Sequence, residues 1–114
     1  MKQVMNIDSI KFGSLNNKYN KNFSLTRSYR DFKNLLILST VKGKIDPPYS
    51  ILILANMYQD YDNVLKPIGD ALQSTGVIDD DKNILAVKII KEPIKRGQMG
   101  SLKVWIETIQ NKGD

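Results

Sequence analysis

Residues 49–76, YSILILANMYQDYDNVLKPIGDALQSTG, set the framework of the chain. The first part, from about Tyr49 to Met57, is a continuous apolar run, which indicates a buried strand. From Asn63 to Thr75 the apolar residues recur at three- and four-residue spacing, which predicts a helix. Gly76 stands where a left-handed C-terminal cap would end that helix. The predicted inward face consists of Val64, Leu65, Ile68, Ala71 and Leu72.

Pro67 restricts where this helix can begin. A proline in a helix interior removes a backbone hydrogen bond and clashes with the preceding turn, so it is best tolerated in the first turn. We therefore expect the helix to begin near Asp62 or Asn63.

Periodic apolar patterns before and after residues 49–76 predict the remaining strands and helix. Val4 to Phe12 alternates weakly and predicts a strand, and the polar residues 13–22 have the composition of a loop. Another helix is expected from an N-cap at Ser24 to about Ser39, because apolar side chains recur there at helical spacing. The last two strands are expected over Ile84 to Ile90 and Leu102 to Ile109, joined by the loop Glu92 to Gly100.

The resulting order is strand, helix, strand, helix, strand, strand. It predicts an α+β fold in which a small mixed sheet packs with two main helices, while the order of the strands in the sheet stays open. The 114 residues are enough for one domain and too few for two, so residues 1–114 are expected to form a single domain. Tyr29 and Phe32 share the apolar helix face and are expected in the core, and Trp105 is expected to pack on the sheet.

The overall composition is that of an ordinary globular protein, with 41% hydrophobic and 25% charged residues. The longest apolar runs, such as Ile51 to Ala55, fall far short of the roughly 20 residues that span a bilayer. The first residues mix polar and apolar side chains and do not have the pattern of a secretory signal. We therefore expect a cytoplasmic protein without a membrane partner.

The chain contains neither cysteine nor histidine. Thiolate nucleophiles, Ser-His dyads and zinc fingers all need one of these residues and are therefore excluded. An enzyme with this composition must use carboxylates, lysines, hydroxyls and metal ions. A carboxylate site favours hard cations such as Mg²⁺ over zinc.

The charges are unevenly distributed around a net value of +5. Residues 1–48 carry nine Lys or Arg and three Asp, whereas residues 49–114 carry eight basic and nine acidic residues. Six of the twelve acidic residues lie between Asp60 and Asp81. A basic protein with one concentrated acidic site suits a metal ion bound beneath a phosphate backbone. Charge alone, however, favours a solvated acidic loop beside scattered lysines.

The acidic residues have a spacing that could form a metal site. Asp60 and Asp62 follow the predicted strand two residues apart, and the strand period of two sends both side chains to the same side. Asp80 and Asp81 lie on the turn before the next strand, and neighbouring strand ends could bring them to the same sheet edge. Three such carboxylates around one or two Mg²⁺ ions would leave positions open for water and phosphate.

Lys66 follows Asp62 by four positions and therefore lies one helical turn further on the same side. Its ammonium could meet the scissile phosphate or offset the charge that builds up in the transition state. The acidic residues and Lys66 can also be interpreted as purely structural. Asp62 or Asn63 could cap the helix, Lys66 and Asp70 could form a surface ion pair, and residues 79–81 could form a hydrated turn.

The combination of motifs resembles the RusA family of Holliday-junction resolvases. Residues 60–72, DYDNVLKPIGDAL, match that family's Asp-x-Asp-Asn-x-x-Lys run and the helix ending Asp-Ala-Leu, and residues 76–81, GVIDDD, match its Gly-containing turn and Asp-Asp pair. Residues 14–19, SLNNKY, resemble its N-terminal Ser-Asn-Asn-basic-Tyr loop, with Leu15 inserted. Ser28-Tyr29-Arg30 and the basic loop from Lys91 to Gly100 extend the resemblance over nearly the whole chain.

The resemblance implies a homodimeric, Mg²⁺- or Mn²⁺-dependent endonuclease that makes paired cuts in four-way DNA junctions. By position, Asp60, Asp62 and Asp81 match the metal-binding aspartates and Lys66 the essential lysine, with Asp80 the adjacent acid and the rival of Asp81. Dimerisation also has a physical rationale, because a junction offers two equivalent strands to a two-fold protein. The sequence departs from the family at Asp79, where a hydrophobic or variable residue is usual, and at Gln59, where the family often carries a basic residue.

The predicted DNA-contacting residues are basic or polar and lie in the N-terminal loop, the first helix and the last loop. They are Asn16, Asn17, Lys18, Tyr19, Lys21, Arg27, Arg30, Lys33, Lys95 and Arg96. Two alternatives remain at this point. One is a nuclease that acts on other branched DNA such as flaps and forks, and the other is a non-catalytic DNA-binding module whose acids are caps and turn residues.

Overall fold

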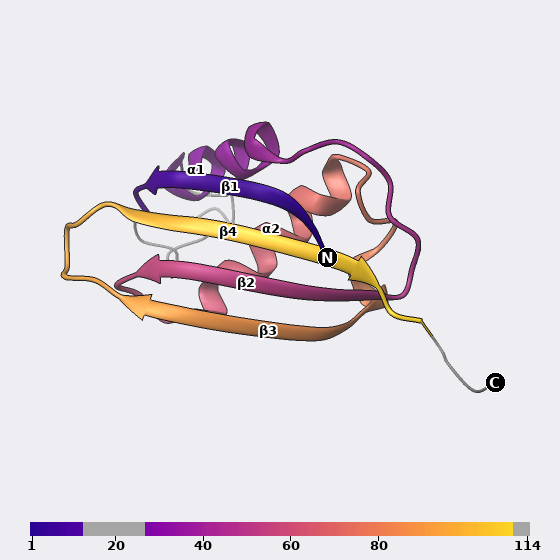
Figure 1. Ribbon diagram of the computed structural model, residues 1–114. Coiled ribbons are helices and arrows are strands. Elements are labelled where there is room, and N and C mark those ends of the chain that lie inside the picture. Colours follow the sequence, from indigo (N-terminus) through magenta and orange to yellow (C-terminus); the bar gives the residue numbers. More distant parts are fainter. Residues whose placement is uncertain (13–26, 111–114) are drawn as a thin grey trace.

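The apolar run at the centre of the sequence forms β2 (Tyr49–Met57), with the bounds that the sequence predicts. The computed structural model describes residues 1–12 and 27–110 (Figure 1). It confirms an α+β fold with a four-stranded mixed sheet and two helices. The other elements are β1 (Lys2–Ile10), α1 (Arg27–Ser39), α2 (Asp62–Ser74), a short 3-10 helix η1 (Asp81–Asn83), β3 (Ile84–Pro93) and β4 (Gly100–Thr108).

The bounds of most elements agree with the prediction to within three residues. β3 continues to Pro93, so the loop to β4 is shorter than expected. The predicted N-cap Ser24 lies outside the described residues. α2 begins at Asp62, where Pro67 was expected to place its start, but Pro67 lies in the second turn rather than the first and is buried there.

The strands are ordered β1-β4-β2-β3. β4 is antiparallel to both β1 and β2, whereas β2 and β3 are parallel and are connected through α2. In the parallel pair Tyr49 lies opposite Ile84 and Met57 opposite Pro93. The end of β2 and the start of β3 therefore lie at opposite edges of the sheet.

Both helices cover one face of the sheet, and the core lies between them and that face (Figure 1). Tyr29 and Phe32 are buried in it, as predicted. Leu65 was expected to point inward but is 37% exposed, because it lies at the border of the buried stripe near the start of α2. Trp105 is half-buried and pairs with Leu52 on β2, on the face that the helices leave open.

Among the described residues, no helix combines the length and the apolar character needed to cross a membrane.

The predicted left-handed cap ends α2. Gly76 has φ +78°, its N–H donates to the carbonyl of Gln73 (3.1 Å), and the N–H of Val77 donates to the carbonyl of Leu72 (3.0 Å). This pair of bonds is a Schellman motif, and the buried side chains of Leu72 and Val77 supply its usual apolar contact. The motif turns the chain sharply from the helix into residues 79–81, three consecutive aspartates that we call the acidic turn.

We expect Gly76→Ala to lower the free energy of unfolding by about 1 kcal/mol, because a β-carbon disfavours positive φ. Gly76→Asn should cost less, because asparagine tolerates the left-handed region. Urea denaturation of the three proteins tests this prediction. Equal stability of Gly76→Ala and the parent would show that the cap geometry is not constrained as described.

Candidate functional site

Asp60 and Asp62 lie where β2 is followed by α2. β2 ends at Met57, Asp60 lies in the turn, and Asp62 is the first residue of the helix. The expectation that both aspartates share a strand face is therefore wrong, because the strand ends before either of them. Both side chains are exposed, and within the described part of the chain neither carboxylate forms a hydrogen bond or ion pair. The N-cap is Tyr61, without a side-chain bond, so neither Asp62 nor Asn63 caps the helix.

The two acidic groups do not meet at one sheet edge. Asp60 and Asp62 follow the end of β2, whereas residues 79–81 precede the start of the parallel strand β3. The expectation that neighbouring strand ends bring them together is therefore wrong. Instead α2 runs back along the sheet and spans the distance between the two groups (Figure 1). Its outer face carries, at helical spacing, Asp62, Lys66, Asp70 and Gln73.

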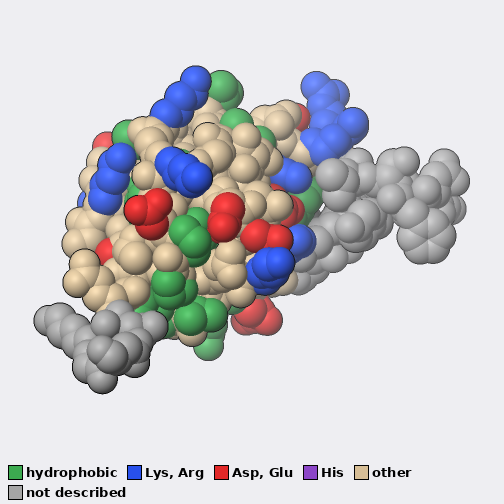
Figure 2. All heavy atoms as spheres, turned by 90° about the vertical axis from the view of Figure 1, so that its right-hand side faces the viewer, with side chains coloured by type: hydrophobic (Ala, Val, Ile, Leu, Met, Phe, Trp, Pro, Cys, Tyr) green, Lys and Arg blue, Asp and Glu red, His purple; other side chains and the backbone are tan. Residues whose placement is uncertain are grey.

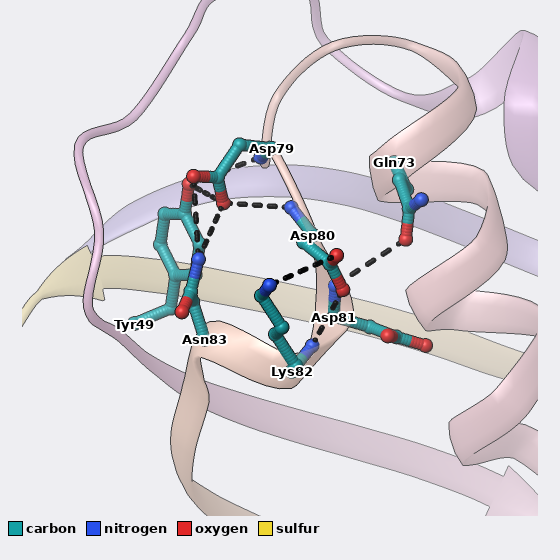
Figure 3. A network of polar contacts seen from close by, with 7 residues as sticks. All are labelled: Tyr49, Gln73, Asp79, Asp80, Asp81, Lys82 and Asn83. Carbon is teal, nitrogen blue, oxygen red and sulfur yellow. Dashed lines mark hydrogen bonds and ion pairs between the residues drawn. The ribbon is translucent and has the colours of Figure 1, made fainter.

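Asp79 attaches the acidic turn to the core (Figure 3). Its Oδ1 accepts hydrogen bonds from the Tyr49 hydroxyl (3.1 Å), from Asn83 Nδ2 (3.1 Å) and from the backbone N–H of Asp80 (2.6 Å). The bond from Asn83, together with those from Tyr49 and Asp80, lowers the pKa of Asp79. Burial raises the pKa of Tyr49, so its hydroxyl keeps its proton at neutral pH. Asp79 is therefore a structural anchor rather than a free acid.

Asp80 and Asp81 point in different directions (Figure 3). Asp80 caps η1 by accepting a hydrogen bond from the Lys82 N–H at 3.0 Å, and its other oxygen lies 3.9 Å from Lys82 Nζ. The Asp81 N–H donates to Gln73 Oε1 at 3.3 Å. The Asp81 side chain lies against α2, where a β-carbon built on Gly69 would be 3.7 Å from the Asp81 Cβ. Of the two rival acids, Asp81 is the one that faces the helix.

Lys66 connects α2 to the acidic turn. Its Nζ lies 3.7 Å from Asp81 Oδ2 and 3.1 Å from Asp70 Oδ1. The other oxygen of Asp70 lies 3.6 Å from the Nζ of Lys33 on α1. The Lys66–Asp70 pair that the spacing suggested is thus present, but it belongs to a larger network that joins α1, α2 and η1.

This network favours the protonated form of Lys66. The hydrogen bond to Asp70 is the largest cause that raises the lysine's pKa, followed by the charges of Asp70 and Asp81. A raised lysine pKa keeps the side chain protonated throughout the neutral range. Lys66 is therefore suited to offset phosphate charge and not to accept a proton.

The carboxylates form two groups along α2 rather than one cage. Within residues 1–12 and 27–110, no cluster of three or more acidic side chains is close enough to hold a metal ion. At 1.5 Å per residue, Asp62 and Gly69, beside which Asp81 lies, are about 10 Å apart along the helix axis. The chemistry of Asp60 and Asp62 nevertheless fits Mg²⁺, which is commonly held by one or two carboxylates together with water and phosphate oxygens.

Four of the predicted DNA-contacting residues lie at the end of the molecule that holds Asp60 and Asp62. β1, β2 and β3 all end there, α1 begins there, and the loop from β3 to β4 lies there (Figure 1). Arg27 and Arg30 belong to the first turn of α1, and Lys95 and Arg96 to that loop; all four are exposed. Lys33 is half-buried and pairs with Asp70 instead. Asn16, Asn17, Lys18, Tyr19 and Lys21 lie outside the described residues.

The opposite end of the molecule has a different surface. Figure 2 faces this end and shows acidic side chains across the middle of the surface, with lysines or arginines around them. The acidic turn thus lies at the other end from Arg27, Arg30, Lys95 and Arg96, with the outer face of α2 between them.

Sequence reasoning missed part of the site. The Lys66–Asp70 spacing suggests only a surface pair, and the Lys33–Asp70 ion pair joins residues that are 37 positions apart on different helices. The anchoring role of Tyr49 had no local signal, because its partner Asp79 is 30 residues away. Both features depend on how the helices and the turn pack.

No model of a known protein family matches the chain, and no curated protein matches it significantly.

The lowered pKa of Asp79 predicts how stability depends on pH. The charged form stabilises the fold, so its contribution is present above the ordinary value of 3.8 and is lost as the pH falls through the lower value of the folded state. Asp79→Asn should therefore be less stable than the parent at pH 7, with a difference that shrinks toward pH 2. Urea midpoints across this range measure the effect, with Asp8→Asn on β1 as the control. A difference that is the same at every pH would contradict the role of the charge.

Proposed function

We propose that this chain is a metal-dependent endodeoxyribonuclease that resolves Holliday junctions by paired phosphodiester hydrolysis in DNA recombination and repair. The proposal includes a RusA-like fold, because the chain's motifs resemble those of the RusA family. It also includes a homodimer that cuts two symmetrically related strands of the junction. The observation that carries it is the contact between Lys66 and Asp81, 3.7 Å apart. These residues are 15 positions apart in the sequence and belong to separate motifs, and a merely hydrated turn would not require them to meet.

The face of α2 offers the groups that phosphodiester hydrolysis needs. Asp60 and Asp62 are exposed carboxylates without another partner among the described residues, which makes them available to a cation. They would hold Mg²⁺ or Mn²⁺, which when bound supplies an activated water and stabilises charge on phosphate oxygens. Lys66 lies one turn along the helix, about 6 Å in axial rise from Asp62, and keeps a positive charge there.

The positions of the basic residues support a DNA substrate. Arg27, Arg30, Lys95 and Arg96 are exposed at the same end as Asp60 and Asp62. A phosphate backbone that approaches this end would meet positive side chains beside the carboxylate pair, which suits an interaction of charged groups with phosphates.

We expect the protein to cut a labelled four-way junction with Mg²⁺ and to leave it intact with EDTA, because the proposed reaction needs a cation to supply the activated water and to stabilise charge on the phosphate oxygens. Mapping of the cuts should show two nicks placed symmetrically. Flaps, forks and linear duplex serve as controls. Equal rates on all substrates would contradict junction selectivity and favour a nuclease that acts on other branched DNA. If no DNA is cut, the non-catalytic DNA-binding module becomes the favoured function.

Single substitutions separate the catalytic carboxylates from the structural ones. Asp60→Asn, Asp62→Asn and Asp81→Asn should each reduce cleavage by about 100-fold. Junction binding, measured by fluorescence anisotropy, should be retained or strengthened because a negative charge near phosphate is removed.

Asp80→Asn is the matched control, because the Asp80 carboxylate contacts Lys82, whereas Lys66 pairs with Asp70 and Asp81. It should cleave at close to the parent rate. Lys66→Ala should lose cleavage like the aspartate variants. If Asp80→Asn is inactive and Asp81→Asn is active, the assignment of the two acids is reversed.

A further inference from the structure

We infer that Asp70 is a positioning residue that holds Lys66 toward Asp81 and away from Asp62. This inference rests on the proposed function, because it concerns how the lysine and the carboxylate pair of that site are kept apart. It assigns a role to a residue that touches neither DNA nor a metal ion in the proposed mechanism.

Two aspartates on α2 are within reach of Lys66. Asp62 lies four residues before it and Asp70 four residues after it, so both share its side of α2. On an isolated helix the pair with the acid on the N-terminal side, here Asp62, is the more favourable one. In the structure Lys66 nevertheless pairs with Asp70, at 3.1 Å. Tertiary contacts must therefore determine this choice.

Two contacts from outside α2 account for the choice. Lys33 on α1 lies 3.6 Å from Asp70 Oδ2, which leaves Oδ1 to face Lys66. The side chains of Lys33 and Asp70 are only 27% and 22% exposed, so water screens this pair less than an exposed one. Asp81 then approaches the same ammonium from η1 at 3.7 Å. The lysine thus has two carboxylates on its C-terminal side.

The consequence is that the Asp62 carboxylate has no ion-pair partner among the described residues. A lysine that turned back to Asp62 would occupy the oxygens proposed to bind the cation and would give up its position beside Asp81. Asp70 prevents both by holding the ammonium one turn further along the helix. In this way a residue outside the proposed metal and phosphate contacts affects both of them.

The test compares Asp70→Asn with the parent and with Glu107→Gln, a matched control. Glu107 forms an ion pair with the N-terminal amine at 3.8 Å on the sheet, away from α2. Asp70→Asn should lower kcat for junction cleavage by about tenfold with little change in KM, and Asp70→Glu should restore part of the loss. Glu107→Gln should leave both constants unchanged.

A second measurement does not depend on cleavage. The ammonium signal of Lys66 in ¹H–¹⁵N NMR spectra, assigned with Lys66→Arg, should shift in Asp70→Asn and stay in place in Glu107→Gln. Lys33→Met, which keeps Asp70 but removes its partner on α1, should shift the signal in the same direction. This variant also serves if Asp70→Asn does not fold.

The outcomes separate the two proposals. A parent that cleaves DNA, with an Asp70→Asn variant that keeps its kcat and its Lys66 signal, would overturn the positioning role and leave the nuclease function intact. A parent that cleaves no DNA would overturn the function. In that case an unmoved Lys66 signal in Asp70→Asn would also overturn the placement of the lysine, and a shifted signal would support it.

Discussion

The parallel pairing of β2 and β3 is the constraint on which the rest of the molecule depends. Parallel neighbours need a crossover that returns the chain to the starting edge of the sheet, and α2 makes this return. The crossover separates Asp60 and Asp62 from residues 79–81 by the length of the strands. It also gives both groups a common surface, because the outer face of α2 passes from one to the other.

The acidic turn is held against α2 by contacts of several kinds. The Schellman motif at Gly76 sets the direction of the chain, and Asp79 attaches the turn to the buried Tyr49. With these in place, the Asp81 backbone meets Gln73 and its carboxylate meets Lys66. The three consecutive aspartates therefore have three different environments, and only one of them faces the candidate site.

The charged side chains on and beside α2 form a series of ion pairs. Lys33, Asp70, Lys66 and Asp81 alternate in sign, so each charge in the series lies beside an opposite one. Asp60 and Asp62, with no such partner among the described residues, keep their charge available at the end of the molecule where Arg27, Arg30, Lys95 and Arg96 are exposed. A carboxylate pair beside basic side chains is suited to a cation and a phosphate together.

The sequence by itself determined the α+β class, the positions of the elements and the cap at Gly76, because these depend on local periodicity and backbone preference. It also singled out Asp60, Asp62 and Lys66 by their spacing, and it left Asp80 and Asp81 as rival acids on the turn. Only the tertiary structure decided the strand order, the choice of Asp81 over Asp80 as the neighbour of Lys66, and the pairing of Lys33 with Asp70. The strand-based arguments for the acids were wrong because β2 ends at Met57 and β3 runs parallel to it. Contacts between residues 15 to 37 positions apart depend on how α1, α2 and the turn pack, and no local pattern records that packing.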